Sequence, residues 1–228
     1  MVTEDALNAG EPLVHQGLSQ RDLLEAWQRI GTPERMAIAC VSAKPLLEQV
    51  CSVAESLWPG IEIVHARAEA YACGVYNAYL QPEKLGVDRW LALLAVRRHY
   101  LQAVCVVDCG TAITLDIMDA TGRHQGGMIC PGLSLMKNSL FRGTENLQFS
   151  EAHYPVGLAD FTEAAIYNGT LSAATGLIEH VLARQPEQTQ LILTGGDAEL
   201  IARQLAFRAI IDTDLVLRGL AMVLTGSL

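Results

Sequence analysis

Apolar and polar positions follow two different periods along the first 65 residues. Helix-spaced apolar positions begin after Ser19, and Asp22 three residues later gives the capping pattern of a helix start. Pro45 suits the first turn of a second helix, and Pro59-Gly60 ends it. A short apolar run follows each helix, and this alternation indicates α/β architecture. The predicted order is helix, strand, helix, strand, at about 20–30, 36–41, 45–57 and 61–65.

The pattern changes after residue 65. The stretch 66–87 has few periodic positions and is predicted to be mostly loop. Three apolar runs joined by tight turns then predict an antiparallel meander, which looks like the start of a second domain. The predicted elements are a helix at 88–100, strands at 103–108, 112–118 and up to about 129, helices at 133–141 and 162–185, a strand at 190–193, a helix from Asp197, a strand at 209–212 and a helix at 215–224.

Composition narrows the class of protein. Half of the 228 residues are hydrophobic, which predicts a folded chain of one larger or two small domains. There are 16 Lys and Arg against 25 Asp and Glu, and the net charge of −9 disfavours nonspecific nucleic-acid binding. No apolar run approaches the ~18 residues that span a bilayer, and the acidic start lacks the regions of a signal peptide. We therefore expect a cytoplasmic protein that binds neither nucleic acid nor membrane.

The six cysteines give no sign of a metal site. They are not arranged as CxxC pairs, so the ligand spacing of a zinc site is missing. Most of them lie within apolar runs. We expect them to be small buried side chains of a protein from a reducing compartment.

The segment Asp108-Cys109-Gly110-Thr111 is the strongest local candidate for a phosphate site. A carboxylate ends a predicted strand there, and a glycine turn and a hydroxyl follow it. Such a turn offers backbone N–H groups and the Thr111 hydroxyl to phosphate oxygens, with Asp108 beside them to hold a cation. The other interpretation is an ordinary hairpin whose Asp and Thr satisfy the turn. The sequence contains neither a P-loop nor a GxGxxG motif.

Two glycine-containing junctions are further candidates. Gly195-Gly196 lies between a strand and a helix, where a ligand can approach the backbone, although packing alone also requires such turns. Gly86-Val87-Asp88-Arg89 begins a helix, so Asp88 is either its N-cap or a general base, with Arg89 close enough to hold an anionic substrate. Tyr79 is either a half-buried aromatic or a ligand contact. The scattered histidines give no support for Ser-His-Asp or Cys-His catalysis.

Taken together, these segments resemble the type III pantothenate kinases, a family of the acetate and sugar kinase/Hsp70/actin superfamily. The matching stretches have the family's order and spacing over about residues 36–228. The resemblance implies an α/β fold of two actin-like (ribonuclease H-like) domains, each a mixed sheet flanked by helices, at 1–101 and 102–228. The stretches are Tyr79 with Leu85-Gly86-Val87-Asp88-Arg89, Asp108 to Asp116, Gly126 to Gly132, the Thr-Glu-Asn-Leu run at 144–147, Thr162 to Gly169, and Thr194-Gly195-Gly196.

The resemblance also implies an activity and a role for each site residue. The activity is ATP-dependent phosphorylation of pantothenate to 4'-phosphopantothenate, the first step toward coenzyme A, with Asp88 as general base. Asp108 matches the family's ligand of a monovalent cation (K⁺ or NH₄⁺), and Mg²⁺ accompanies ATP. The family is dimeric, with the substrate pocket near the subunit interface, so we expect a homodimer. The implied substrate contacts are Tyr79, Gly86, Val87, Asp88, Arg89 (suited to the pantothenate carboxylate) and Thr162, and the implied ATP contacts are Gly110, Thr111, Gly195 and Gly196.

The chain departs from the family pattern at its start. No Asp-x-Gly-Asn-Thr phosphate loop precedes residue 36, so roughly 15–20 residues, two short strands and a turn, are expected to be missing. Three interpretations remain open: the natural protein has the loop upstream, the chain is a homologue that has lost kinase activity, or weak activity persists through Asp108 and Thr111. A form extended by the loop is expected to be more stable, because loss of a central strand exposes ladder groups. The alternative function is a binding or regulatory accessory role, which would not need Asp88.

Overall fold

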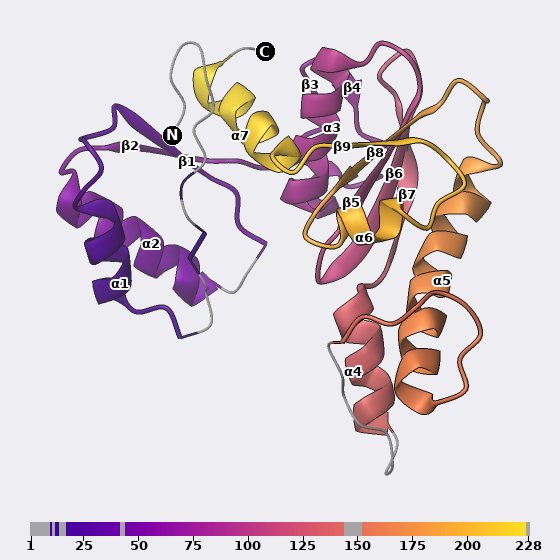
Figure 1. Cartoon of the computed structure of the whole chain (residues 1–228). Helices are drawn as coiled ribbons and strands as arrows, with labels where there is room; N and C mark the ends of the chain where they lie inside the picture. The colour runs from indigo at the N-terminus through magenta and orange to yellow at the C-terminus, as the bar shows by residue number, and fades with distance from the viewer. Residues whose placement is uncertain (1–9, 11, 14–16, 42–43, 144–151, 227–228) are drawn as a thin grey trace.

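The computed structural model describes residues 10, 12–13, 17–41, 44–143 and 152–226, and its main helices and strands follow the predicted order (Figure 1). The run at 144–147 that contributes to the family resemblance lies outside the described residues. The elements before residue 100 are α1 (Gln20–Trp27), β1 (Arg35–Ile38), α2 (Lys44–Leu57), β2 (Glu62–His65), β3 (Tyr71–Ala72), β4 (Val75–Tyr76), the 3-10 turn η1 (Pro82–Lys84) and α3 (Val87–His99). Those after it are β5 (Val104–Cys109), β6 (Ala112–Met118), β7 (His124–Pro131), α4 (Leu133–Gly143), α5 (Thr162–Leu182), β8 (Gln190–Thr194), α6 (Ala198–Ala202), β9 (Ala209–Ile211) and α7 (Leu215–Thr225).

The N-terminal part is a parallel pair of strands, β1 and β2, connected by α2. The predicted capping pattern is confirmed: the Ser19 hydroxyl accepts from the Asp22 N–H, and the Asp22 carboxylate accepts from the Ser19 N–H. Helix α1 contacts α2, and Trp27 stacks on Trp58 with ring centroids 5.7 Å apart. Among the described residues β1 pairs with β2 alone.

The stretch 66–87 is mostly loop, as predicted, and it also contains the small hairpin β3–β4, which was not predicted. Its turn residues Cys73 and Gly74 both have positive φ (48° and 76°), as a two-residue hairpin turn requires. Glycine adopts this conformation readily, whereas cysteine rarely does, so the usual Asn-Gly or Asp-Gly signal is missing. Strands of two residues are also too short to show an alternating pattern.

The C-terminal half folds around one five-stranded sheet with the order β7-β6-β5-β8-β9. The first three strands are antiparallel, so the predicted meander is confirmed. Strands β8 and β9 are parallel to β5, because helices connect them to the rest of the sheet. This is a mixed sheet flanked by helices, as expected for the C-terminal domain.

Helices cover both faces of this sheet. Side chains alternate along β5, so that Val104 and Val106 join the core formed by α3 and α7, while Cys105 and Val107 join the core formed by α5 and α6. Helices α4 and α5 contact each other and extend beyond the sheet as an arm (Figure 1). The strand β6 therefore has one face toward α3, and this orientation determines where its polar side chains lie.

The tightest helix contact joins the two halves of the chain. Helix α3 lies before the predicted domain boundary at 101/102, yet it packs on the five-stranded sheet together with α7. A Cβ at Gly219 of α7 would overlap the Leu91 carbonyl of α3, so glycine permits this close approach. The boundary itself stays a prediction. No described helix is both long and apolar enough to cross a membrane.

Candidate active site

The turns that the sequence singles out for phosphate binding meet at one end of the five-stranded sheet. The β5–β6 turn holds Gly110 and Thr111, and β8 ends next to it because β8 pairs with β5. The Asp197 N–H after β8 donates to the Cys109 carbonyl (3.0 Å). The Gly132 N–H after β7 donates to the Thr111 carbonyl (2.9 Å). Hydrogen bonds therefore join three successive turns into one surface.

Glycine is required at two points of this surface. Gly195 has φ of 90°, and a Cβ there would lie 2.5 Å from Asp108 Oδ1 and 2.6 Å from the Cys109 carbonyl carbon. A Cβ at Gly132 would overlap the carbonyl oxygen of Gly110. Gly196, in contrast, has no atom within 4 Å of its would-be Cβ, so its backbone is open to a neighbour. The first two glycines are explained by packing, and the third leaves room for a ligand.

Asp108 is the partly buried carboxylate of this surface. Burial, and then the negative charge of Asp88, raise the pKa of Asp108 above its ordinary value. No positively charged side chain contributes to that pKa shift, and none of the ion pairs among the described residues contains Asp108. A carboxylate that is partly desolvated and unpaired fits a bound cation, because the cation would offset the cost of its charge.

Asp88 lies at the start of α3 and faces Asp108 closely enough to affect its titration. Its N-cap interpretation is wrong, because Gly86 is the N-cap and the Asp88 carboxylate accepts from the first-turn N–H of Arg89 (2.8 Å). A Cβ at Gly86 would lie 2.6 Å from Asp88 Oδ1, so glycine leaves the space that the carboxylate occupies.

Arg89 is buried, with 5% of its surface exposed, and its guanidinium faces another residue of the chain. Its Nε and Nη2 donate to the two oxygens of Asp116 at 2.8 and 2.6 Å, and its Nη1 donates to the Tyr79 hydroxyl at 2.9 Å. Arg89 and Tyr79, two predicted substrate contacts, are therefore adjacent. Asp116 lies within a matching motif, but no role was assigned to it from the sequence. The sequence did contain a signal for Asp116: a charged residue inside an apolar strand needs a partner when it is buried.

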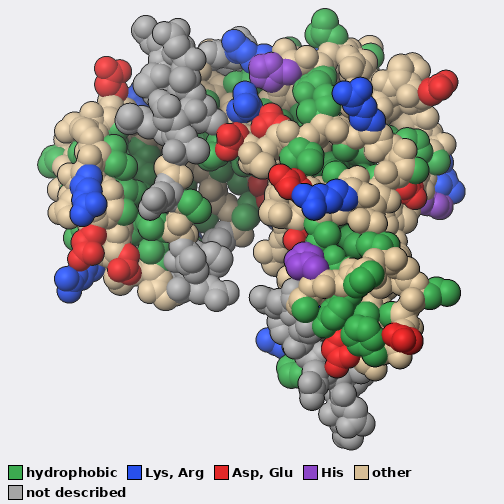
Figure 2. Space-filling model, in the orientation of Figure 1, with side chains coloured by type: hydrophobic (Ala, Val, Ile, Leu, Met, Phe, Trp, Pro, Cys, Tyr) green, Lys and Arg blue, Asp and Glu red, His purple; other side chains and the backbone are tan. Residues whose placement is uncertain are grey.

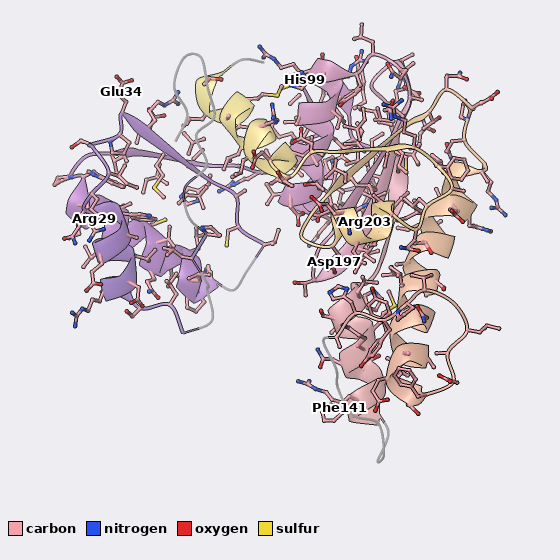
Figure 3. All side chains as sticks on the ribbon, in the orientation of Figure 1. Arg29, Glu34, His99, Phe141, Asp197 and Arg203 are labelled. Carbon is pink, nitrogen blue, oxygen red and sulfur yellow. The ribbon has the colours of Figure 1, made fainter. Side chains whose placement is uncertain are left out.

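Thr162 lies apart from the other predicted residues, at the start of α5 on the arm. It is exposed and lines an apolar groove of about 650 Å³ between α4 and α5, together with Leu140 and Gly169. Phe141, which follows Leu140, lies at the far end of the arm from Asp197, which lies beside the sheet (Figure 3). Thr162 therefore lies on the arm, whereas the turns around Asp108 lie at the end of the sheet.

A polar hollow of about 200 Å³ lies beside the Gly195-Gly196 turn, and it was not predicted from the sequence. It is lined in part by Ser134, Lys137, His153, Tyr167 and Asp197, contributed by α4, α5 and the segments next to α5 and α6. Burial raises the pKa of Asp197, although the positive charges of Lys137 and His153 act in the opposite direction. These residues are far apart in the sequence, so no local pattern could have joined them.

The cysteines match the expectation from the sequence only in part. None of the six forms a disulfide, but only Cys105 and Cys109 are buried, and burial raises the pKa of both thiols to about 12. A reactive cysteine needs a lowered pKa, so neither thiol is poised as a nucleophile. In the part of the chain that the structure describes, no group of three or more His, Cys, Asp or Glu is arranged to hold a metal ion.

Comparison with known proteins identifies the family. The family model described as type III pantothenate kinase matches residues 14–184, which is most of the chain. The chain belongs to the type III pantothenate kinase family. A type III pantothenate kinase of Nitrosococcus oceani is 40% identical over 215 residues, covering 90% of this chain and 80% of that protein. One from Halorhodospira halophila is also 40% identical, over 196 residues, covering 82% of this chain and 75% of its own.

A solved structure agrees with the fold of this type III pantothenate kinase family member. A Campylobacter jejuni protein assigned to the Baf family of transcriptional activators superposes with a TM-score of 0.63. The likeness covers 92% of this chain and 89% of that one, at 22% sequence identity. At this identity the similarity concerns the fold alone, and it confirms the α/β class predicted from the sequence.

Proposed function

We propose that the protein phosphorylates pantothenate with ATP, giving 4'-phosphopantothenate, and that Asp88 is its general base. The observation that supports this most is the approach of two carboxylates, Asp88 and Asp108, beside hydrogen-bonded glycine turns. Phosphoryl transfer depends mainly on positioning and charge neutralisation, and both need such a surface. Membership of the type III pantothenate kinase family supplies the substrates.

Asp88 would take the proton of the pantothenate primary hydroxyl as that oxygen attacks the γ-phosphorus. The Asp88 carboxylate can orient the hydroxyl by accepting its hydrogen bond. Its own hydrogen bond to the Arg89 N–H fixes the side chain in one direction. Because a general base of this kind contributes about 10²–10⁴-fold to the rate, its loss should be measurable.

The ATP side would be formed by the three joined turns. Gly110 and the exposed Thr111 would contact phosphate oxygens, and Gly195-Gly196 would lie along the adenosine. Asp108 would hold K⁺ or NH₄⁺, consistent with its unpaired and partly buried carboxylate. Mg²⁺ would enter with the phosphates of ATP, since it retains several waters and usually binds through phosphates and one or two carboxylates. The positive charge of Lys137 in the neighbouring hollow suits an anionic nucleotide.

The pantothenate side would be formed by the start of α3 and by Tyr79. Gly86 and Val87 precede Asp88, so a substrate hydroxyl at Asp88 would lie against them, whereas the buried Arg89 would act on the site through Tyr79. We also propose that Thr162 contributes to this site from a second copy of the chain. The support is its place at the start of α5, on the arm, and the apolar groove around it.

A homodimer would bury the α4–α5 arm. Hydrophobic side chains gather over the arm in the space-filling view (Figure 2). Leu135, Leu140, Phe141 and Phe161 are each 40–49% exposed there. Small residues on the exposed side of α5, including Gly169 and Ala173, would allow another helix to approach closely.

The proposal is tested by pantothenate-dependent release of ADP in the presence of Mg-ATP, with and without K⁺. We expect turnover that K⁺ stimulates, and the Asp88→Asn variant should lose about 10²–10⁴-fold in kcat. The variant should bind pantothenate and unfold at a temperature close to that of the unchanged chain, which serves as control. An unchanged chain that releases no ADP in response to pantothenate, with K⁺ present, would contradict the proposal.

The same variant separates the alternative, a binding or regulatory accessory role. Such a role does not need a general base, so Asp88→Asn should retain it. The observation in its favour is the fold likeness to the Campylobacter jejuni protein assigned to the transcriptional activators. The net charge of −9 argues against direct nonspecific contact with DNA.

A further inference from the structure

A hydrogen-bonded network of polar side chains lies next to the proposed substrate site. It connects Tyr79, Arg89, Asp116 and His124, which belong to four different segments. Arg89, Asp116 and His124 are 3–5% exposed, whereas Tyr79 is only partly buried. The network therefore ends at Tyr79, whose side chain a ligand can reach.

Each hydrogen bond between the four side chains of this network has the geometry of a strong hydrogen bond. Arg89 donates to both oxygens of Asp116 and, through Nη1, to the Tyr79 hydroxyl. The Asp116 Oδ1 also lies 2.8 Å from Nε2 of His124. The backbone N–H of Ala78 donates to Nδ1 of His124 at 3.4 Å, and this arrangement leaves Nε2 to donate to Asp116.

The surrounding backbone is shaped for this arrangement. A Cβ at Gly127 would overlap Asp116 Oδ1 and lie 2.5 Å from Arg89 Nη2, so only glycine leaves room for the ion pair. The Tyr79 N–H donates to the Asn77 side chain at 3.0 Å, which holds the segment before Tyr79. The Tyr79 ring stacks on His124, with an interplanar angle of 15° and centroids 6.2 Å apart.

Two ionised groups are buried here, which is costly unless each is fully paired. Burial raises the pKa of Asp116, but the hydrogen bonds from His124 and Arg89 outweigh it and leave that pKa below its ordinary value. Asp116 is therefore a fixed anion. It accepts hydrogen bonds from Nε and Nη2 of Arg89, which leaves Nη1 free to donate to the Tyr79 hydroxyl.

We propose that Asp116 and His124 are positioning residues for pantothenate: they fix Arg89, and Arg89 fixes the hydroxyl of Tyr79 in the substrate site. This inference rests on the proposed function. A purely structural ion pair would affect stability alone, whereas a positioning role affects the recognition of one substrate. The two roles therefore differ in which kinetic constant changes.

The test is a double-mutant cycle in the full chain, read as KM for pantothenate, KM for ATP and kcat. Asp116→Asn should raise the KM for pantothenate about tenfold or more, the effect of removing a hydrogen bond to a charged group, and should leave the KM for ATP within about twofold. In an Arg89→Met background the same change should have no further effect on pantothenate, because Asp116 acts through Arg89. His124→Phe, which retains the stacked ring and removes both nitrogens, is a milder second variant and should act in the same direction.

Ile178→Ala is the matched control, since Ile178 is fully buried on the opposite face of the sheet. It should lower the unfolding temperature and leave the KM for pantothenate unchanged. The inference is overturned if the two network variants lower only the unfolding temperature, or if Asp116→Asn and Arg89→Met act additively. An unchanged chain that neither turns over nor binds pantothenate overturns the proposed function instead, and the inference with it.

Discussion

Asp108 has an environment that favours the neutral form of its carboxyl group. Its pKa in the folded chain is raised above the ordinary value of 3.8 by burial and by Asp88. The folded state therefore holds a proton that the unfolded state has already lost, and stability falls as the pH rises from about 4 through the raised pKa. A cation at Asp108 would reverse this cost at neutral pH. Function and stability thus make opposite demands on this one residue.

The first prediction follows from this conflict. In buffer without K⁺ at neutral pH, Asp108→Asn should unfold at a higher temperature than the unchanged chain, by roughly 2–4 °C, because it removes a buried charge that lacks a cation. The difference should shrink as the pH falls below the raised pKa. Adding K⁺ should raise the unfolding temperature of the unchanged chain and leave the variant unaffected. Scanning calorimetry across pH measures all three effects, and a lower unfolding temperature for Asp108→Asn at neutral pH would contradict the argument.

At the scale of elements, the glycines within helices differ in how close their neighbours lie. On the exposed side of α5, Gly169 and Gly176 have no neighbour within 4 Å of a would-be Cβ. The close approach is instead at Gly219 of α7, which lies against the Leu91 backbone of α3. The backbone of α3 cannot move away easily, because its residues around Leu91 are fully buried.

The second prediction compares two glycines within helices. Gly219→Ala should destabilise the chain by about 1–3 kcal/mol or more, since the added methyl overlaps backbone atoms of a buried helix. Gly176→Ala should stabilise it by about 0.5–1 kcal/mol, because alanine is the better helix former and the site is open. Urea unfolding gives both free energies. Equal effects of the two substitutions would show that the α3–α7 contact is not as close as described.

The sequence was informative wherever one element has a strong period of its own. The capping pattern at Ser19 and the meander after residue 103 were predicted for that reason, and both are confirmed. The hairpin at Cys73 was missed because its strands have two residues each. The pairing of Arg89 with Asp116, 27 positions away, depends on which face of β6 packs on α3, and no local pattern specifies that. The roles of Asp88 and Asp108 came from motifs in register, and their mutual approach appears only in the fold.

At the scale of the whole molecule, the residues of the proposed site are divided between the sheet and the arm. The turns around Asp108 lie at the sheet, whereas Thr162 lies in the groove between α4 and α5. A dimer formed through the arm would bring Thr162 of one copy to the substrate site of the other. The site would then be complete only in the dimer, and inactivating changes in the two parts would complement each other.

The third prediction uses this division. Chains with Asp88→Asn and chains with Thr162→Arg should each be nearly inactive alone, the first for lack of the base and the second because a long cation fills the groove. After the two are unfolded together and refolded in equal amounts, half of the dimers are mixed, and each mixed dimer has one site with both natural residues. Turnover should then recover to about a quarter of that of the unchanged chain, as expected when independent sites add. If Thr162 served its own chain's site, no mixed dimer would contain an intact site, and the mixture would stay as inactive as its parts. Light scattering on each variant is the control, because Thr162→Arg must remain dimeric for recovery to report on the shared site.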